Sequence, residues 1–223
     1  SKDITYAVST SGSATEGTDY QSIDDVTVSG ETASFSITLI DDSISDINET
    51  IDLTLTATDK GIELCDETLT SNTITIIDDE AAPTITLAAS ASSIAENAGS
   101  SITLTATSSI ISGSDITVSF DSSGTATEGT DYGSISDITI SAGSTTGTTT
   151  FTPTDDSMYE TSTDETATIA IGTVSGGGAT ESGSQSVTLT IEENDSAPTV
   201  TLAASSSSIA ENAGSSITLT ATL

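Results

Sequence analysis

This chain of 223 residues has no histidine, no tryptophan and a single cysteine, and only two of its side chains are basic. The two lysines, Lys2 and Lys60, face 34 acidic residues, which gives a net charge of −32. Nucleic acids and anionic lipid surfaces are recognised by basic side chains, so both classes of partner are excluded. The lone thiol of Cys65 cannot form a disulfide within the chain, and without histidine it is a poor nucleophile, so we expect a loop or core cysteine.

Long hydrophobic runs are also missing, and none approaches the ~20 residues that a membrane helix needs. We therefore expect no membrane insertion in this segment. The chain opens without a secretion signal, which means little if it is an excerpt of a longer protein. Aromatic residues make up only 3% of the chain, so any core must be built from small aliphatic side chains.

The apolar residues that are present are mostly β-branched and alternate with threonine and serine, in short runs such as TITLAAS (84–90) and SITLTAT (101–107). High net charge with few aromatics is typical of disorder, but alternation with a period of two is typical of strands. We therefore predict folded β-structure. No segment has a convincing helical period.

Internal repetition determines the domain organisation. The segment APTITLAASASSIAENAGSSITLTAT at 82–107 returns at 197–222 with two differences. Residues 1–20 match residues 113–132 at twelve of twenty positions. One repeat unit is therefore about 112 to 115 residues long.

The boundaries between units fall at two prolines that follow acidic clusters, Pro83 and Pro198. Residues 83–196 then form one complete unit, residues 1–80 lack the opening segment of a unit, and residues 198–223 supply only that opening segment. Two arrangements are open. The chain is either an excerpt of a longer tandem array, or a subunit whose last strands complete the first unit of an identical neighbour, head to tail.

Seven strand-like runs are expected in the complete unit, separated by glycine, serine and aspartate. Apolar side chains alternate within these runs and therefore share one face of each strand. Seven short one-faced strands in about 110 residues predict two antiparallel sheets packed on one core, an immunoglobulin-like β-sandwich. The predicted fold class is all-β, with such sandwiches in tandem. The expected strands cover residues 84–90, 101–107, 115–121, 135–140, 147–153, 166–174 and 185–192. The expected core-facing residues are Ile85, Leu87, Ile102, Leu104, Ile116, Val118, Phe120, Ile138, Ile140, Ala167, Ile169, Ile171, Val187, Leu189 and Ile191.

Acidic residues are concentrated in the connections between these runs, which gather at the two ends of a sandwich. The densest connection, TPTDDSMYETSTDE (152–165), has five carboxylates and no basic residue. Converging carboxylates repel one another by roughly a few kcal/mol per close pair, and a divalent cation reverses that repulsion. Calcium fits best, because it takes about six to eight oxygen ligands in irregular geometry, whereas magnesium demands a stricter octahedron and soft metals favour histidine or cysteine. The alternative is that these acids form solvated loops and that Asp131 only makes a turn hydrogen bond.

Four motifs occur in order: GTATEGTDY (124–132), a hydrophobic hairpin, DDSMYE followed by DE, and an acidic strand exit. This order resembles the Calx-beta domain, a calcium-binding immunoglobulin-like module, and the resemblance covers the whole chain. It implies calcium ligands in the complete unit at positions that match the family's motifs, with Met158 lending a backbone carbonyl. These positions are Glu96, Asp131, Asp155, Asp156, Met158, Glu160, Glu165, Glu193 and Asp195.

The same resemblance implies a second set of ligands in the first unit. That unit lacks a counterpart of Glu96, so Glu211, from a preceding repeat or a neighbouring subunit, is needed to complete the set. The complete unit departs from the family because Asn194 stands where an acid is usual, and because ETSTDE (160–165) is two residues longer than DINE (46–49). We expect its site to hold fewer ions. The first-unit positions are Asp19, Asp41, Asp42, Asp46, Glu49, Asp78, Asp79 and Glu80.

Near-identical tandem units, rich in threonine, serine, aspartate and glycine, resemble the extender regions of large bacterial surface proteins and adhesins. We therefore predict an extracellular, cell-surface structural repeat in which calcium stiffens the junctions between units and stabilises a lean core. Its partners would be adjacent repeats of the same chain or identical subunits, head to tail. The alternatives are a filament subunit and a calcium-sensing regulatory module, because Calx-beta domains also occur in sodium-calcium exchangers.

An enzyme is not expected. Paired carboxylates such as Asp155 and Asp156 could resemble the pair of a glycosidase. A catalytic acid, however, needs a raised pKa in an apolar cleft, and sugar binding needs aromatic platforms that this tryptophan-free chain does not offer.

Overall fold

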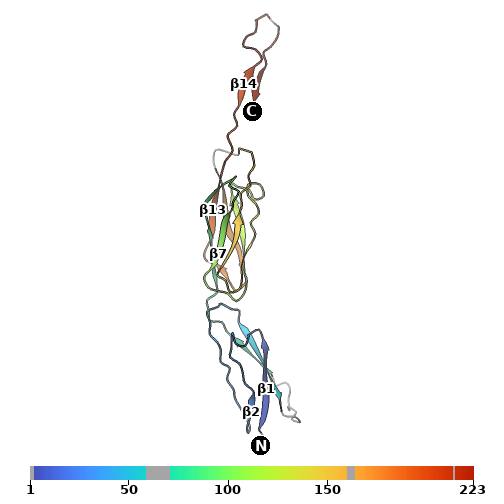
Figure 1. Cartoon of the computed structure of the whole chain (residues 1–223), viewed down its shortest axis with the longest axis vertical. Coiled ribbons are helices and arrows are strands. Elements are labelled where there is room, and N and C mark those ends of the chain that lie inside the picture. The colour runs from blue at the N-terminus through green and yellow to red at the C-terminus, as the bar shows by residue number, and fades with distance from the viewer. Residues whose placement is uncertain (1–2, 59–70, 160–163, 213) are drawn as a thin grey trace.

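The computed structural model describes residues 3–58, 71–159, 164–212 and 214–223. The molecule is elongated, and a first unit with one sheet, a second unit with two sheets and a C-terminal hairpin follow one another along its long axis (Figure 1). Two residues singled out from the sequence, Cys65 and Glu160, lie outside the described residues. Within those ranges no helix is long and apolar enough to cross a membrane.

The second unit, residues 83–196, is built from two sheets. One sheet has the strand order β10-β7-β5-β12 and the other has the order β6-β13-β11-β8-β9. All seven predicted strands are present, and the all-β prediction is confirmed. The strand bounds are β5 Thr84–Ala89, β6 Ser93–Ala95, β7 Ile102–Ser108, β8 Ile116–Gly124, β9 Ile138–Ile140, β10 Thr146–Phe151, β11 Glu165–Ser175, β12 Thr180–Glu181 and β13 Ser186–Glu192.

Two short strands were not predicted, and both pair in parallel: β6 with β13, and β12 with β5. The sequence pattern had indicated antiparallel sheets, but each of the two sheets also contains one parallel pair and is therefore mixed. The opening segment of the unit changes sheet between β5 and β6. This change lets β6 run beside the last strand, β13, in the same direction.

The core of the second unit lies between the two sheets. Every predicted core-facing residue is buried or packs against the buried cluster, with Phe120 and Val187 the two that stay partly exposed. The rings of Tyr132 and Phe151 add a tilted aromatic contact, with centroids 4.7 Å apart. The period-two pattern therefore places these side chains correctly.

The first unit consists of a single four-stranded antiparallel sheet of order β2-β1-β3-β4 in the part of the chain that the structure describes. This sheet is the counterpart of β9-β8-β11-β13. Residues 32–37 correspond to β10 but form no strand. Since β10 takes its ladder hydrogen bonds from β7, the lack of a β7 counterpart explains this difference. The bounds are β1 Ile4–Gly12, β2 Val26–Val28, β3 Glu49–Ala57 and β4 Ser71–Ile76.

The C-terminal segment forms an isolated antiparallel hairpin, β14 Thr201–Ala204 and β15 Leu219–Thr222. Every residue of both strands is exposed. The hairpin lies at the opposite end of the molecule from the first unit (Figure 1).

Backbone hydrogen bonds join the first unit to the second. The amide of Ser45 donates to the carbonyl of Ile111 at 2.9 Å, and the amide of Gly113 donates to the carbonyl of Ser45 at 3.1 Å. Ser45 and Ser112 are buried at this junction. The loop that carries Asp41, Asp42 and Asp46 is thus the part of the first unit that contacts the second.

Candidate metal centre

Eight acidic side chains surround one cleft at the end of the first unit that contacts the second. The cleft has a volume of about 70 Å³, and isoleucine side chains complete its lining. All eight first-unit positions predicted as ligands line it, although they come from four separate stretches of the chain. These residues are Asp19, Asp41, Asp42, Asp46, Glu49, Asp78, Asp79 and Glu80.

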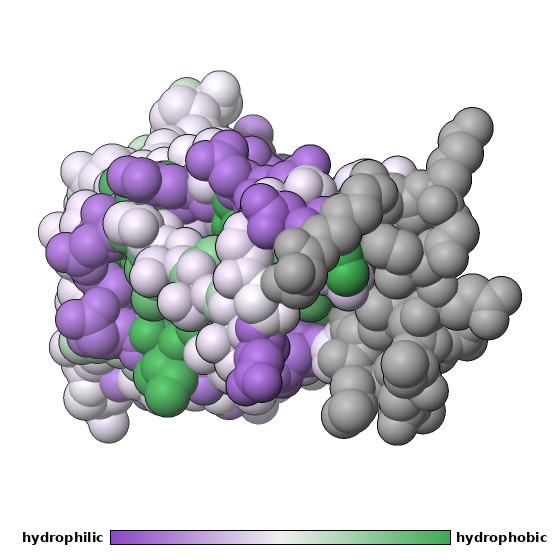
Figure 2. Space-filling model, turned by 90° about the horizontal axis from the view of Figure 1, so that it is seen from below, coloured by the Kyte–Doolittle hydropathy of each residue, from purple (hydrophilic) through white to green (hydrophobic). Residues whose placement is uncertain are grey.

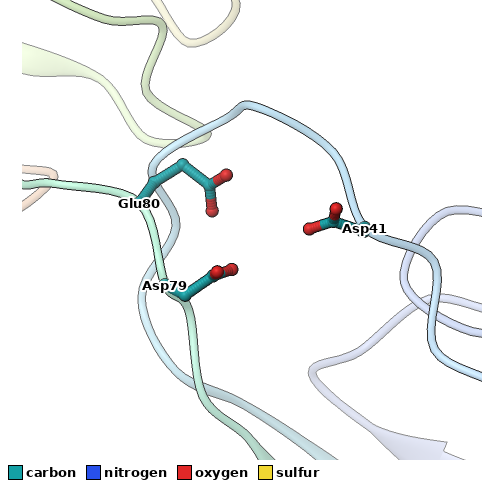
Figure 3. A group of neighbouring side chains, drawn as sticks. All are labelled: Asp41, Asp79 and Glu80. Carbon is teal, nitrogen blue, oxygen red and sulfur yellow. The ribbon is translucent and has the colours of Figure 1, made fainter.

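Three of these acids converge most closely. Asp41, Asp79 and Glu80 each offer one carboxylate oxygen, and the three oxygens lie within 4.8 Å of one another. Figure 3 shows the side chains pointing into a common space from two different segments. Two oxygens on opposite sides of one calcium ion lie about 4.6 to 5.2 Å apart, so this spacing suits a shared ion.

Asp19 is held by its own turn. Its Oδ2 accepts a hydrogen bond from the amide of Thr15 at 2.5 Å, and Tyr20 next to it is buried. In the second unit the amide of Thr127 donates to Oδ2 of Asp131 at 2.6 Å, and Tyr132 is buried. The turn hydrogen bond that we raised as an alternative role for Asp131 is therefore present, and it uses one of the two carboxylate oxygens of Asp131.

Crowding raises the pKa of several carboxyls around the first-unit cleft. Burial, together with the charge of Asp19 and a hydrogen bond to it, raises the pKa of Glu49 to about 6. Burial also raises the pKa of Asp46, with further contributions from neighbouring aspartates. The pKa of Glu80 is raised by desolvation and by its hydrogen bond to Asp78. Both lysines of the chain lie outside the described residues, so the described part of the chain has no basic side chain that could offset this negative potential.

In the second unit the closest group is Glu96, Glu193 and Asp195, with one oxygen from each within 4.8 Å of the others. Glu96 follows β6 and is only 7% exposed. The parallel pairing of β6 with β13 positions it, because the amide of Glu96 donates to the carbonyl of Glu192 at 3.1 Å. A short strand that was not predicted thus brings the entry of the unit to its acidic exit.

The DD loop joins this group through Glu96. Oε1 of Glu96 accepts a hydrogen bond from the amide of Asp156 at 3.1 Å. The side-chain amide of Asn194 donates to Oδ1 of Asp155 at 3.5 Å, so the residue that departs from the family pattern lies inside the cluster. The amide of Met158 donates to Oδ1 of Asp156 at 2.6 Å, while the Met158 side chain is exposed.

Asp195 has the environment expected of a cation ligand. Its Oδ2 is buried and accepts no hydrogen bond from the residues that the structure describes. Desolvation raises the pKa of its carboxyl, and the charges of Glu193, Asp155 and Asp156 raise it further. Glu165, also predicted as a ligand, begins β11 and has a buried carboxylate oxygen, Oε2.

One kind of hydrogen bond, present once in each unit, was not predicted from the sequence. Oδ1 of Asp164 accepts a hydrogen bond from the amide of Glu193 at 3.4 Å, and Oδ1 of Asn48 accepts one from the amide of Asp78 at 3.2 Å. In both units the residue before a long strand therefore holds the backbone of the acidic exit. Aspartate and asparagine side chains both carry an Oδ1 atom that can accept such a bond. The only signal in the sequence was that Asp164 and Asn48 each precede a glutamate that begins a strand.

Glu211 lies apart from the cleft that it was predicted to complete. It is exposed in the C-terminal hairpin, at the far end of the molecule from the first unit (Figure 1). Among the residues that the structure describes, no counterpart of Glu96 lies at the first-unit cleft.

One family model matches nearly the whole chain. The family model of the Calx-beta domain matches residues 3–80 and again residues 78–195. The chain is similar to a crystal structure of the calcium binding domain CBD12 of CALX1.1, with 17% identity over 78% of this chain and 69% of the other and a TM-score of 0.30. For CBD12 from CALX1.2 the identity is 18%, the coverages are 77% and 68%, and the TM-score is 0.29. A search of curated proteins finds no match.

Proposed function

Since this chain belongs to the Calx-beta domain family, which it matches in two consecutive copies, we propose that it is a calcium-binding structural repeat of an extracellular protein. In this role calcium ions bind at the acidic ends of the sandwiches and stiffen the junctions between them. The repeat would hold a distal binding domain away from a bacterial cell surface, or form part of an extracellular fibre.

The observation that carries this proposal is the convergence of eight carboxylates on one cleft. The donor set is made of oxygen atoms alone, which suits a hard cation. The raised pKa of Glu49, Asp46 and Glu80 shows that the metal-free cleft disfavours its own negative charge, and a bound divalent cation would reverse this effect. The irregular arrangement of turn, loop and strand-exit ligands favours calcium over magnesium.

The junction contacts connect ion binding to stiffness. Asp46 contacts the second unit directly, because a Cβ atom built on Gly113 would lie 1.7 Å from its Oδ1. Ser45, the residue before it, exchanges two backbone hydrogen bonds with residues 111 and 113. An ion held by Asp41, Asp42 and Asp46 would therefore order the loop on which the second unit rests.

Two features support a structural role outside the cell. The core is lean, so ions that bind only the folded loops would add needed stability by mass action. Extracellular calcium modules commonly bind at about 0.1 to 1 mM, a range in which such a repeat would be loaded outside a cell and empty inside it.

Calcium titration of the whole chain tests the proposal. Isothermal calorimetry on chelator-treated protein should show binding at about 0.1 to 1 mM, and saturating calcium should raise the melting temperature by about 10 °C or more. Equal concentrations of magnesium should produce a much smaller shift. Small-angle scattering should show a narrower range of molecular lengths with calcium than with chelator.

A matched pair of variants makes the test specific to the cleft. Asp41→Asn removes a carboxylate from the close group and should weaken calcium binding, whereas Glu31→Gln alters an exposed acid outside the cleft and should not. Absence of binding heat and of any change in melting temperature up to about 10 mM calcium would overturn the proposal and leave these acids as a solvated surface.

A further inference from the structure

The last strand of the second unit, β13, is covered along nearly all of one edge but only along part of the other. β11 pairs with β13 from Ser186 to Ile191. On the opposite edge, β6 pairs with β13 only from Thr190 to Glu192. Among the residues that the structure describes, the stretch Ser186–Leu189 therefore has a neighbouring strand on one side alone.

The backbone of this stretch directs hydrogen-bonding groups to the open edge. Further along β13, the amide of Thr190 donates to the carbonyl of Ser92, and the carbonyl of Glu192 accepts from the amide of Glu96. Because the hydrogen-bonding direction alternates along a strand, Ser186 and Thr188 present their amides and carbonyls on this same side. Main-chain donors and acceptors are thus available where β6 ends.

A groove runs beside this edge, between β13 and the connection from β5 to β6. Its volume is about 320 Å³, and it is lined by Val187, Thr188, Leu189, Ala89, Ala91 and Ser92. Val187 and Ala89 pack against the core of the unit but stay partly exposed, so the groove reaches the margin of the core. The connection diverges from β13 here because β5 belongs to the other sheet.

The sequence of the free stretch does not protect its edge. Natural proteins commonly guard a free edge with a charged side chain, a proline or a bulge. Ser186–Leu189 has neither charge nor proline, although the chain contains 34 acids, and its pairing with β11 is regular. By contrast, the edge strand β10 packs against β9 so closely that a Cβ atom built on Gly147 would lie 2.6 Å from the carbonyl oxygen of Thr139. An uncovered and uncharged edge beside a groove is suited to strand addition.

The two faces of the sheet define the side chains of the matching strand. On the outer face, Oγ1 of Thr188 and Oγ1 of Thr168 on β11 share a hydrogen bond 3.0 Å long. An added strand would extend this row, and hydroxyl side chains pair favourably across strands. On the inner face, its side chain would enter the groove beside Val187, which favours a small aliphatic group. The matching segment therefore alternates threonine or serine with a residue such as valine.

Charge narrows the partner further. None of the six residues that line the groove is charged, so a charged side chain placed there would lose hydration without an ionic partner. Figure 2 shows hydrophilic side chains spread over the first-unit end of the molecule, and the whole chain carries a net charge of −32. Acidic partners, including a second copy of this chain, are therefore repelled. A different protein that offers an uncharged strand with basic flanks fits best.

We propose that the free edge of β13 at Ser186–Leu189 binds an extended, uncharged segment of another protein by strand addition. The segment, of about four or five residues, runs antiparallel to β13, the more stable pairing, and lies in line with β6. Main-chain hydrogen bonds join it to Ser186 and Thr188, and its apolar side chain fills the groove beside Val187. The site uses no carboxylate, so it goes beyond the proposed calcium function and does not depend on it.

Amide exchange in the full chain, followed residue by residue by NMR, tests this site. Without ligand, the amide of Thr188 should exchange at least about tenfold faster than those of Val187 and Leu189, which point toward β11. The probe is the synthetic peptide KKTVTVTKK, which should bind with a Kd of about 1 mM or tighter. Saturating peptide should slow exchange at Thr188 about tenfold or more. The control peptide has proline at its central position, which removes a main-chain donor at equal charge.

Four results would overturn the proposal. A Thr188 amide that is already as protected as its neighbours would mean that the edge is occupied within the chain. Equal binding of both peptides would mean that their lysines bind the acidic surface and that the edge binds nothing. Protection that rises with protein concentration alone would identify a second copy as the occupant. The fourth result is no change at Thr188 up to about 5 mM peptide.

Matched variants at two exposed alanines locate the site. Ala91→Tyr fills the groove and should weaken binding of KKTVTVTKK by about tenfold or more. Ala142→Tyr adds the same side chain in a turn outside the groove and should change binding by less than about twofold. Because both positions are exposed, both variants should melt within about 2 °C of the wild-type chain. Equal losses of affinity would show that the groove is not the binding site.

Calcium separates this site from the proposed function. Because no carboxylate lines the groove, the affinity for the peptide should differ by less than about threefold between calcium and chelator. If the peptide binds and calcium does not, the strand-addition site stands and the calcium function fails. If calcium binds and the peptide does not, the calcium function stands and the strand-addition site fails.

Discussion

The two units share a repeat but bury it to very different extents. In the second unit the buried cluster extends across both sheets. In the first unit it is far smaller, although the strands of the retained sheet pair in the same register. Its buried members among the described residues are Ala14, Tyr20, Ile51 and Leu53. An alternating strand pattern therefore yields a core only where strands from distant parts of the chain cover it.

The acidic loops behave differently from the core. Both units bring predicted carboxylates from separate parts of the chain together, eight in the first unit and Glu96, Glu193 and Asp195 among the described residues of the second. Both also hold the Asp19 or Asp131 turn with the same hydrogen bond. One sheet and a local turn are enough to position these loops. The comparison separates a core that needs the second sheet from a candidate ion site that largely does not.

The largest expected effect is a difference in what the same core position contributes to stability. Leu189→Ala should lower the free energy of unfolding of the second unit by about 2 to 5 kcal/mol, because the side chain is fully buried. Ile74 pairs with Ile51 as Leu189 pairs with Ala167, but it is 38% exposed. Ile74→Ala should therefore lower the free energy of unfolding of the first unit by only about 1 kcal/mol or less. Hydrogen exchange measured by mass spectrometry reports each unit separately. Equal losses would mean that the first unit is as well covered as the second.

Exchanging the residues at one exit position sharpens the comparison of the two ion sites. Asp79 of the first unit corresponds to Asn194 of the second. Asn194→Asp should increase calcium affinity of the second unit by about tenfold, because it adds a carboxylate beside Asp155. Asp79→Asn should decrease that of the first unit by a similar factor. Calorimetric titration measures both, and no change in either variant would show that this position does not bind the ion.

Acidification should have opposite effects on the metal-free and the calcium-bound first unit. The pKa of Glu49 is raised to about 6 in the folded chain, above its unfolded value of 4.5, so the folded unit binds more protons between these values. Metal-free stability should therefore fall as pH rises from about 4.5 to 6. Calcium must displace the same proton, so its affinity should drop about fourfold from pH 7.5 to 5.5.

The control for the pH experiment is Glu49→Gln, measured by melting with chelator and by calorimetry with calcium. Both dependences should flatten in this variant. A calcium affinity in the wild-type chain that stays constant down to pH 5.5 would remove Glu49 from the ion site.

The smallest expected effect concerns the contact between the units. Gly113→Ala places a methyl group where Oδ1 of Asp46 lies, and the carboxylate can rotate away. We expect about a twofold loss of calcium affinity in the first unit and a broader length distribution by small-angle scattering. Gly133→Ala, whose Cβ would lie 4.0 Å from its nearest neighbour, is the control and should change neither. Identical scattering for both variants would mean that this contact does not restrain the junction.

Much of the fold was predictable because the pattern is local. Alternation identified seven of the nine strands of the second unit and its core side, and ordered motifs identified the family. The strands β6 and β12, of three and two residues, were missed because no longer alternating run contains them, whereas β9, also three residues long, lies inside the predicted run 135–140. Residues 32–37 alternate as a strand should, yet form none, because the strand that would pair with them is not a local property of the sequence.

The sequence predicted which acidic residues lie at the candidate site, but not the hydrogen bonds that hold the backbone around it. Spaced acidic motifs named the eight residues that line the first-unit cleft. That these residues bind calcium stays a prediction. The hydrogen bonds from the amide of Glu193 to Asp164 and from the amide of Gly113 to Ser45 were not predicted, because backbone amides and short polar side chains occur throughout the chain.

The parallel pairing of β6 with β13 has a mechanical consequence. A tensile force along the molecule pulls β6 toward the N-terminus and β13 toward the C-terminus, so the hydrogen bonds between them, including Thr190 to Ser92 and Glu96 to Glu192, are loaded together in shear. They cannot open one after another as a zipper does. An ion bound by Glu96, Glu193 and Asp195 would cross-link the end of this clamp, and the force needed to extend the unit would then follow the calcium concentration around it.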